Sequence, residues 1–375
     1  MPIRTLHIDI EGGWGGSSRS LFELTSKFHP NQIYPVIAHR QKGPISKRYK
    51  KIGIQSHHMP EIFSYAPKLR VKNFKNFIAS IPKMLELPKI INKIINMVKL
   101  YKIQIIHLNY EGLFIMAKLL KEKLNVPIIC HSRTQIPDDI FGRYLVKTLS
   151  KNVDHIFFIS PQEKKRFCRI EMGSKVSKSI MWNISAKKNG GRLKRTSEVV
   201  YFGDISPDKG TDRLIDIAKE LESEKEITIA VYGTERSKKG FLEHLIAKSK
   251  SQGIQNKIIF RKHNPEPEKI MRQSLALVRP SRYNDPWGRD VIEATCNGLP
   301  VLATGNFSGV IKSKTNGFLF NAFNAKKIAQ KIIELHNNQK LWDKLSKAGL
   351  KIGKKFSGQS QVKHFYETSK GLIKK

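Results

Sequence analysis

Two carboxylates lie eight positions apart in PSRYNDPWGRDVIEATCNGLPVLAT, the segment from 280 to 304. Asp285 falls in a predicted turn beside Gly288, and Glu293 falls on a helix predicted over 290–297. The unpaired NH groups at the start of such a helix favour a phosphate, and a carboxylate further along can accept hydrogen bonds from two hydroxyls of a ribose or hexose. An ordinary αβ unit with two solvated acids would show the same spacing.

A glycine-rich loop follows the first predicted strand. It contains four glycines, Gly12, Gly13, Gly15 and Gly16. Glycines at a strand-to-helix turn let backbone NH groups approach a diphosphate, or let an acceptor lie close above the sheet. We expect Ser17 or Ser18 to cap the following helix. No lysine follows as in a P-loop, and Ser18 occupies the third glycine position of a dinucleotide fingerprint.

Polar residues also follow two other predicted strands of the first half. His131 comes directly after the strand at 127–130, and residues 109–111, Asn-Tyr-Glu, follow the strand at 104–108. The carboxyl ends of parallel strands line the ligand crevice of such a sheet, so His131 is a candidate site residue and 109–111 could meet an acceptor. A single histidine at a strand end is also commonly a structural hydrogen-bonding residue.

Apolar runs of strand length alternate with helical segments along the whole chain. In the first half the predicted strands are 5–10, 34–38, 104–108, 127–130 and 154–159, and predicted helices include 17–27, 83–99 and 113–123. After a polar stretch at 185–197, which we interpret as a linker, strands are predicted at 199–203, 227–233, 257–260, 275–278 and 300–303. The alternation predicts two α/β domains with parallel sheets and a ligand cleft between them.

The segment at 280–304 resembles the signature of the retaining glycosyltransferases of family 4, a large family with the GT-B fold. In that signature an acid, seven residues and a glutamate precede a strand introduced by glycine and proline. Glu293 matches the second acid, and Asp285 stands where a longer glutamate is usual. The resemblance implies that Glu293 holds the ribose hydroxyls of a nucleotide sugar and Asp285 the sugar hydroxyls.

A second match, YFGDISPDKGTDRLI, resembles the family's strand, Gly-Arg pair, loop, Lys-Gly pair and helix. Gly203 and Lys209 match, and the ammonium group of Lys209 would neutralise the donor phosphates. Asp204 stands where an arginine is usual, and a carboxylate there would repel a diphosphate. We expect Asp204 to turn away, or a nearby arginine to supply the charge, with Arg236 and Arg282 as candidates.

A third match, GNFSGVIKSKTNGFLF, resembles the glycine turn and strand that close the donor pocket in this family. Backbone NH groups around Ser308 and Gly309 could hold phosphate oxygens, and Gly288 permits a similarly close approach. The N-terminal loop resembles the GGxxxS turn that opens many family 4 enzymes. The predicted site therefore also includes three of its glycines, Gly13, Gly15 and Gly16.

The resemblance implies a GT-B fold, in which two doubly wound Rossmann-like domains face a cleft. We assign residues 1–184 to an acceptor-side domain and 185–356 to a domain that binds the nucleotide sugar. Residues 357–375 are predicted to form a terminal helix that returns to the first domain, as in GT-B proteins.

Composition limits the partners. The chain of 375 residues has 68 Lys and Arg against 31 Asp and Glu, a net charge of +37, which predicts contact with polyanions or with an anionic membrane surface. No aromatic-interleaved basic run and no known nucleic-acid-binding signature is found, so no specific nucleic acid is expected. The helix predicted around Lys89, Lys93 and Lys99 is either a packed helix with solvated lysines or a membrane-surface helix.

The remaining sequence features concern metals and location. Cys130, Cys168 and Cys296 are far apart, and Asp138 and Asp139 are adjacent rather than spaced as a metal-binding DxD motif. We therefore expect reduced thiols, no metal and no cofactor besides the nucleotide sugar co-substrate. No apolar run has the length of a membrane span, which predicts a cytoplasmic protein, with peripheral attachment to the inner face of the membrane as a further expectation.

Together these patterns predict a metal-independent glycosyltransferase. It would move a sugar from a nucleotide diphosphate sugar to a hydroxyl of a glycan or lipid-linked glycan with retention, using four catalytic residues, Asp285, Glu293, Lys209 and His131. Two alternatives stay open. A sugar-nucleotide epimerase has the same architecture, and a non-catalytic polyanion-binding protein of this fold would suit the charge and Asp204.

Overall fold

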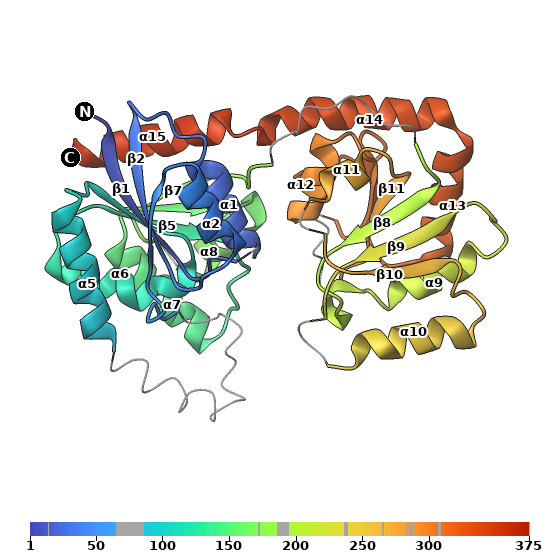
Figure 1. Ribbon diagram of the computed structural model, residues 1–375, viewed down its shortest axis with the longest axis horizontal. Helices are drawn as coiled ribbons and strands as arrows, with labels where there is room; N and C mark the ends of the chain where they lie inside the picture. The colour runs from blue at the N-terminus through green and yellow to red at the C-terminus, as the bar shows by residue number, and fades with distance from the viewer. Residues whose placement is uncertain are drawn as a thin grey trace. The chain divides into compact units, whose positions relative to one another are not determined.

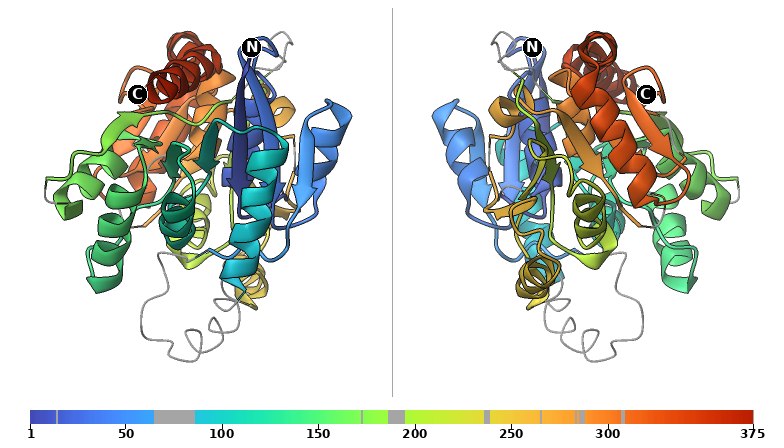
Figure 2. Two further views of the ribbon diagram at one scale, coloured as in Figure 1. Left: turned by 90° about the vertical axis from the view of Figure 1, so that its left-hand side faces the viewer. Right: turned by 90° about the vertical axis from the view of Figure 1, so that its right-hand side faces the viewer.

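The chain folds into two compact units, which are described separately. The computed structural model describes residues 1–13, 15–64, 86–171, 173–185, 195–235, 239–264, 266–282, 284, 288–306 and 309–374. The first unit comprises Met1–Ile184 and Gly358–Lys375, and the second comprises Ser185–Ser357. Each unit is a parallel sheet with helices on both faces (Figures 1 and 2).

The first unit is built on a parallel sheet in the order β3-β2-β1-β4-β5-β6-β7. Its strands are β1 (Ile3–Asp9), β2 (Ile33–His39), β3 (Gln55–His58), β4 (Ile105–Leu108), β5 (Ile128–Ser132), β6 (His155–Phe158) and β7 (Ser177–Ile180). The strand order reverses between β1 and β4. The loops that follow these two strands therefore open at the point where ligands bind in doubly wound sheets.

Helices of the first unit pack on both faces of this sheet. One face is covered by α1 (Gly16–Thr25), α2 (Pro44–Lys51) and α15 (Gln359–Ile373). The other is covered by α5 (Leu87–Leu100), α6 (Phe114–Lys123), α7 (Ile140–Asn152) and α8 (Pro161–Glu171), and the 3-10 turn η1 (Glu111–Leu113) follows β4. The apolar side of α5 lies in this core, with Ile90, Ile94 and Val98 buried, so α5 is a packed helix whose lysines are solvated.

The second unit repeats the plan with a parallel sheet in the order β10-β9-β8-β11-β12-β13. Its strands are β8 (Glu198–Phe202), β9 (Thr228–Tyr232), β10 (Ile258–Arg261), β11 (Ala276–Arg279), β12 (Val301–Thr304) and β13 (Gly317–Phe320). Its helices and 3-10 turns are η2 (Pro207–Lys209), α9 (Arg213–Glu220), α10 (Phe241–Ser251), α11 (Glu268–Met271), α12 (Arg289–Cys296), α13 (Ala325–Asn337), α14 (Gln339–Gly353) and η3 (Lys354–Phe356). Here the order reverses between β8 and β11.

The structure confirms all ten strands that the apolar runs predict, with ends shifted by one or two residues. Two strands that the runs do not predict, β3 and β7, have the polar sequences QSHH and SKSI. Both lie at the edges of the first sheet and are only partly buried, so they need no apolar pattern. Most of the predicted linker, residues 186–194, lies outside the described residues.

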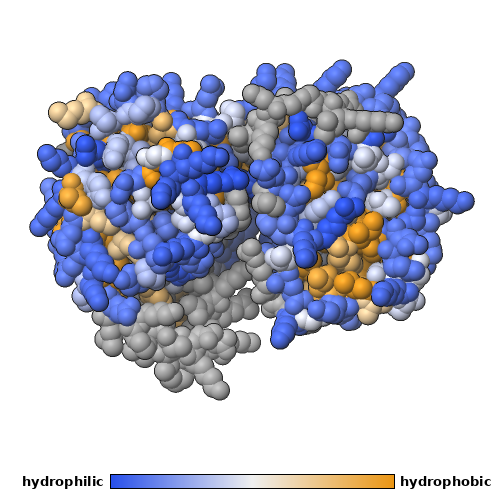
Figure 3. Space-filling view, in the orientation of Figure 1, coloured by the Kyte–Doolittle hydropathy of each residue, from blue (hydrophilic) through white to orange (hydrophobic). Residues whose placement is uncertain are grey.

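Hydrophilic side chains cover most of the face shown in Figure 3. Among the helices of the described residues, none combines the length and the apolar content that a membrane crossing requires.

Candidate functional site

Two loops of the second unit begin side by side at its strand reversal. The loop after β8 carries Gly203, Asp204 and Lys209, and the loop after β11 leads into α12, which carries Glu293. Strands β8 and β11 are paired neighbours, so both loops leave the same edge of the sheet. The segments that carry Lys209 and Glu293 therefore both start from the carboxyl edge of the sheet at its strand reversal.

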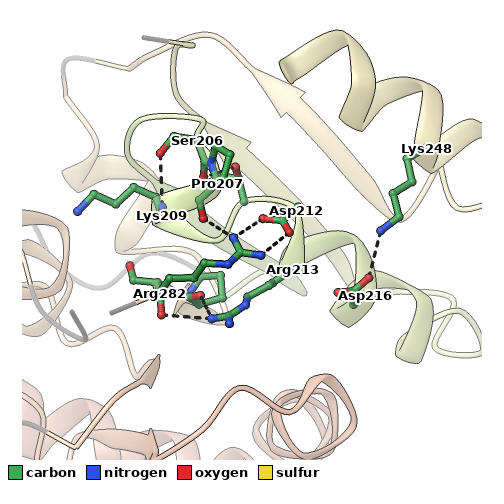
Figure 4. A network of polar contacts seen from close by, with 11 residues as sticks. Ser206, Pro207, Lys209, Asp212, Arg213, Asp216, Lys248 and Arg282 are labelled. Atoms are coloured by element: carbon green, nitrogen blue, oxygen red, sulfur yellow. Dashed lines mark hydrogen bonds and ion pairs between the residues drawn. The ribbon is translucent and has the colours of Figure 1, made fainter. Parts of the chain in front are cut away.

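Arg282 ties these two loops together (Figure 4). Its guanidinium group donates to the two carboxylate oxygens of Asp212 at 2.8 and 2.7 Å, and also to the carbonyl of Pro207. Burial acts to raise the pKa of Asp212, but the hydrogen bonds and charge of Arg282 outweigh it and leave that pKa below its usual value. Asp212 therefore stays ionised at neutral pH.

Two further contacts hold the loops against each other. Arg213 donates to the carbonyl of Pro280 at 3.0 Å. Gly210 has a φ of 70° and lies so close to the second loop that a Cβ there would be 2.1 Å from the same carbonyl oxygen. Only glycine suits both the left-handed backbone and this approach. The turn carrying Lys209 is consequently fixed to the segment that precedes α12.

Lys209 and Asp204 both make backbone contacts within this turn. The backbone NH of Lys209 donates to Ser206 Oγ at 3.4 Å, and its half-buried side chain extends away from the Arg282–Asp212 pair (Figure 4). The backbone carbonyl of Asp204 accepts from the Tyr201 hydroxyl at 2.8 Å. Of the two arginines expected to compensate for Asp204, Arg282 forms an ion pair with Asp212, and Arg236 lies outside the described residues.

Helix α12 begins with two consecutive ionic residues, and both form buried ion pairs. Arg289 donates to Glu293 Oε1 at 2.9 Å, and Arg279, at the end of β11, donates to both carboxylate oxygens of Asp290 at 2.8 Å. Gly288 leaves room for the second pair, since a Cβ there would lie 2.6 Å from Asp290 Oδ1. The close approach expected at Gly288 is thus made to side chains of the same unit.

Asp285 and Ser308 lie outside the described residues, but their neighbours are placed. Asn284 and Asn306 exchange two hydrogen bonds, from Asn284 Nδ2 to Asn306 Oδ1 at 2.7 Å and from the Asn306 backbone NH to Asn284 Oδ1 at 2.9 Å. These bonds join the loop after β11 to the loop after β12, and Gly309 is exposed in the latter.

In the first unit, the buried carboxylate of Asp9 contacts the start of α1, directly after the glycine loop. Ser18 donates to Asp9 Oδ2, and the N-cap of α1 is Gly15, with no side-chain cap. The expected serine cap is therefore wrong, because the buried Asp9 at the end of β1 is the partner that Ser18 takes. A Cβ on Gly15 would collide with the Glu11 carboxylate, and Gly16 is exposed in the first turn of α1. Among the described residues, none besides the chain neighbours has an atom within 4 Å of the Cβ position of Gly13.

Asn109 connects this loop to a polar network that the sequence did not predict. Its Nδ2 donates to Asp9 Oδ1 at 2.9 Å, and its Oδ1 accepts from Arg133 Nε at 3.1 Å. Arg133 also donates to Asn183 Oδ1 at 3.0 Å. The network links the carboxyl ends of β1, β4 and β5. It could have been suspected only from the polar residues that directly follow each strand.

Glu111 lies beside this network and is fully buried. Its carboxylate accepts from the backbone NH of Arg133 at 2.7 Å and from the Thr134 hydroxyl. Burial raises the pKa of Glu111, although these hydrogen bonds partly oppose the shift. The polar end of β4 is therefore occupied by contacts within the first unit.

His131 lies in a layer of buried aromatic rings on the α15 side of the first sheet. Its ring centroid is 5.6 Å from that of His107 and 5.7 Å from that of Phe157. His107 in turn contacts His7, with 2.9 Å between their Nδ1 atoms. Burial lowers the pKa of His131 well below its usual value, so the ring is neutral near pH 7.

The described residues contain no group of three or more His, Cys, Asp or Glu side chains arranged to hold a metal ion. The three cysteines are free thiols, with Cys130 and Cys296 buried.

The two units have the fold of the GT-B glycosyltransferases. Residues 14–177 match the family model described as Glycosyltransferase Family 4, and residues 184–352 match the model described as Glycosyl transferases group 1. The chain therefore carries one glycosyltransferase domain in each of its two units.

Individual proteins show the same likeness. The uncharacterized glycosyltransferase MJ1178 of Methanocaldococcus jannaschii is 28% identical over 282 residues, which is 71% of this chain and 75% of that protein. The structure of Anabaena Alr3699/HepE in complex with UDP-glucose aligns with a TM-score of 0.79 at 15% identity, over 98% of this chain and 100% of that chain. Sucrose-phosphate synthase from Thermosynechococcus elongatus aligns with a TM-score of 0.75 at 15% identity, over 99% of each chain. These structures establish the fold.

Proposed function

We propose that this protein is a retaining glycosyltransferase that moves a sugar from a nucleotide diphosphate sugar to a hydroxyl of a glycan or lipid-linked glycan, without a metal ion. The bond between the anomeric carbon and the diphosphate oxygen breaks, and a bond from the anomeric carbon to the acceptor oxygen forms. The proton of the acceptor hydroxyl leaves with the nucleotide diphosphate. The nucleotide sugar is a co-substrate, and no cofactor is assigned.

The observation that carries this proposal is the joint between the two loops of the second unit. Arg282 and Asp212 connect the turn that carries Lys209 to the segment that leads into Glu293. Lys209 would neutralise the leaving diphosphate, Glu293 would bind the ribose hydroxyls and Asp285 the transferred sugar. Charges that are fixed before the reaction stabilise a developing phosphate charge without further reorganisation, which is the usual main source of rate enhancement in such a step.

Glycines supply the remaining donor contacts. The backbone around Gly203 and Gly309 would approach phosphate oxygens at the carboxyl edge of the second sheet. A nucleotide sugar as donor is supported by Alr3699/HepE, which has this fold and whose structure was determined with UDP-glucose. In the first unit, no described residue besides the chain neighbours lies close to the Cβ position of Gly13, which supports an acceptor position above the glycine loop. His131 would act near the transferred sugar as a neutral ring.

The test begins with nucleotide binding. Saturating UDP, GDP or ADP, or the matching nucleotide sugar, should raise the unfolding free energy by about 2.7 kcal/mol at a hundred times the dissociation constant. Glu293→Ala should remove this effect together with donor turnover. The control is Glu334→Ala, which changes a half-exposed glutamate on α13.

Three results would contradict the proposal. Absence of a shift with every nucleotide diphosphate at millimolar concentration would leave polyanion binding as the better account. Conversion of the donor to another nucleotide sugar without an acceptor would identify an epimerase. Full activity of Glu293→Ala would overturn the residue assignment.

A further inference from the structure

A strongly basic surface lies on the first unit, outside the donor site. Between Glu23 and Glu61 the sequence contains no acidic residue. The loop after β2 and helix α2 carry six cations in this interval, Arg40, Lys42, Lys47, Arg48, Lys50 and Lys51. The four lysines are exposed and the two arginines are half-buried. We call these six residues the α2 patch.

The α2 patch adjoins the glycine loop. The backbone NH of Arg40 donates to the carbonyl of Asp9 at 3.1 Å, and the backbone NH of Ser46 donates to the carbonyl of Gly12 at 3.4 Å. A Cβ on Gly43 would lie 2.8 Å from that same Gly12 oxygen. The patch therefore begins at the edge of the sheet where the glycine loop opens, since β1 and β2 are parallel neighbours.

The apolar residues of α2 face inward. Ile45 and Tyr49 are 0% and 1% exposed and pack with Phe22 and Ile37. The helix thus presents cations to solvent without an apolar side that could enter a bilayer, which argues against membrane insertion as its purpose. Its length of eight residues corresponds to about 12 Å, so it can contact a stretch of polymer rather than one anionic group.

The first acidic residue after this interval, Glu61, forms an ion pair with Lys93 of α5. Exposed lysines are flexible point charges that suit phosphate groups whose spacing varies.

We propose that the acceptor is a polyanionic glycan or polyol chain that carries phosphate groups along its backbone, and that the α2 patch binds the units next to the reacting one. The proposal rests on the proposed function for the transfer itself. Binding of the chain along α2 would place one of its hydroxyls over the glycine loop. The specificity for an anionic acceptor then comes from a surface adjacent to the site of transfer.

The test compares two fourfold variants with the same change in charge. Lys42, Lys47, Lys50 and Lys51 are replaced by glutamine in the first, and the exposed lysines of α14, Lys340, Lys344, Lys347 and Lys351, in the second. The α2 variant should raise the dissociation constant for a fluorescent glycerol phosphate oligomer at least about tenfold. The nucleotide-induced thermal shift and the rate of donor hydrolysis of this variant should stay within about twofold of the wild-type values, which would show that the variant is folded. The α14 variant should change none of these values.

Salt and a lipid control complete the experiment. Raising sodium chloride from 50 to 300 mM should weaken oligomer binding by the wild type much more than by the α2 variant, because salt screens exposed charges. Equal oligomer binding by the α2 variant and the wild type overturns the proposal. The proposal is also overturned if the α2 variant loses binding to phosphatidylglycerol vesicles but keeps binding to the oligomer, because the patch would then be a membrane-binding surface. If the wild type binds no nucleotide but its oligomer binding depends on the patch, the proposed function fails and the patch assignment stands.

Discussion

The guanidinium group of Arg289 lies 2.9 Å from the carboxylate of Glu293, one helical turn further along α12, and the two side chains are only 13% and 4% exposed. A buried carboxylate is stable as an ion only when a cation or hydrogen-bond donors compensate for the lost water. Arg289 therefore holds the proposed ribose ligand in one orientation before any nucleotide arrives. The family resemblance did not predict this pairing.

Arg289→Met removes the ion-pair partner of Glu293 and should lower both the stability of the protein and its nucleotide affinity. Loss of one member of a buried ion pair is expected to lower the unfolding free energy by about 3 kcal/mol. Nucleotide affinity should fall as well, because the carboxylate then loses the partner that fixes its orientation. Urea denaturation and isothermal titration measure the two effects. The double variant Arg289→Met with Glu293→Gln should regain stability without regaining affinity, and unchanged affinity in the single variant would refute this account.

Asp204→Arg should improve donor binding. The substitution replaces a carboxylate by a cation on the turn that carries Lys209, where a diphosphate is proposed to bind. For a partly exposed charge we expect an effect of about 1 kcal/mol, or about a fivefold lower KM for the donor. Asp208→Arg introduces the same charge change in the same turn, at an exposed position, and should have a smaller effect. Equal effects of the two substitutions would show that only net charge matters.

Arg282→Met should reduce catalysis more than stability. The side chains of Arg282 and Asp212 are each about 30% exposed. Loss of this ion pair should therefore lower the unfolding free energy by no more than about 1 kcal/mol. The turn that carries Lys209 would lose its main link to the loop after β11, and we expect kcat/KM to fall about tenfold. Steady-state kinetics test this, with Lys331→Met as the control because it breaks a half-exposed pair on α13. Equal kcat/KM values for the wild type and Arg282→Met would exclude a positioning role.

Acid should destabilise the first unit. Burial lowers the pKa of His7 to about 3 and of His155 to about 4, whereas unfolded histidines titrate near 6.5. The unfolded chain therefore binds more protons below about pH 6.5. The stability that the neutral rings contribute is complete above that pH and falls as the pH drops toward 4, by up to about 1.4 kcal/mol per pH unit for each ring.

Urea midpoints at pH 7.5, 6 and 5 measure this dependence. His155→Gln keeps a polar side chain next to Ser177 and Ser179 and should reduce the slope, and His244→Gln, at an exposed position, should not. A midpoint that stays constant from pH 7.5 to 5 would contradict the expected acid sensitivity.

Much of the fold was readable from the sequence because both sheets are parallel and buried. Continuous apolar runs such as those of β8 and β12 identify strands regardless of which face each residue takes. Because both faces of these sheets are buried, the sequence does not show which face each side chain occupies. Cys130 and His131 are both fully or nearly buried on opposite faces of β5, so no alternation shows which of them turns toward α15.

The candidate site was predicted less completely, because its connections join distant parts of the chain. Arg282 and Asp212 are 70 positions apart, and no local pattern indicates that they meet. The Arg289–Glu293 pair could have been read from its spacing of four residues on a predicted helix. The serine cap failed for a physical reason, since a buried aspartate is a stronger attraction for a hydroxyl than the start of the helix.

The position of α15 bears on how the protein is made. Phe365 lies 5.5 Å from the ring of His7 and 5.3 Å from that of Phe28, so it completes the core of a unit whose sheet is synthesised first. A ribosome must translate the entire second unit before this helix emerges. Until then the nascent first unit lacks the cover over its histidine layer. The core of the first unit is therefore completed only after the second unit has been synthesised.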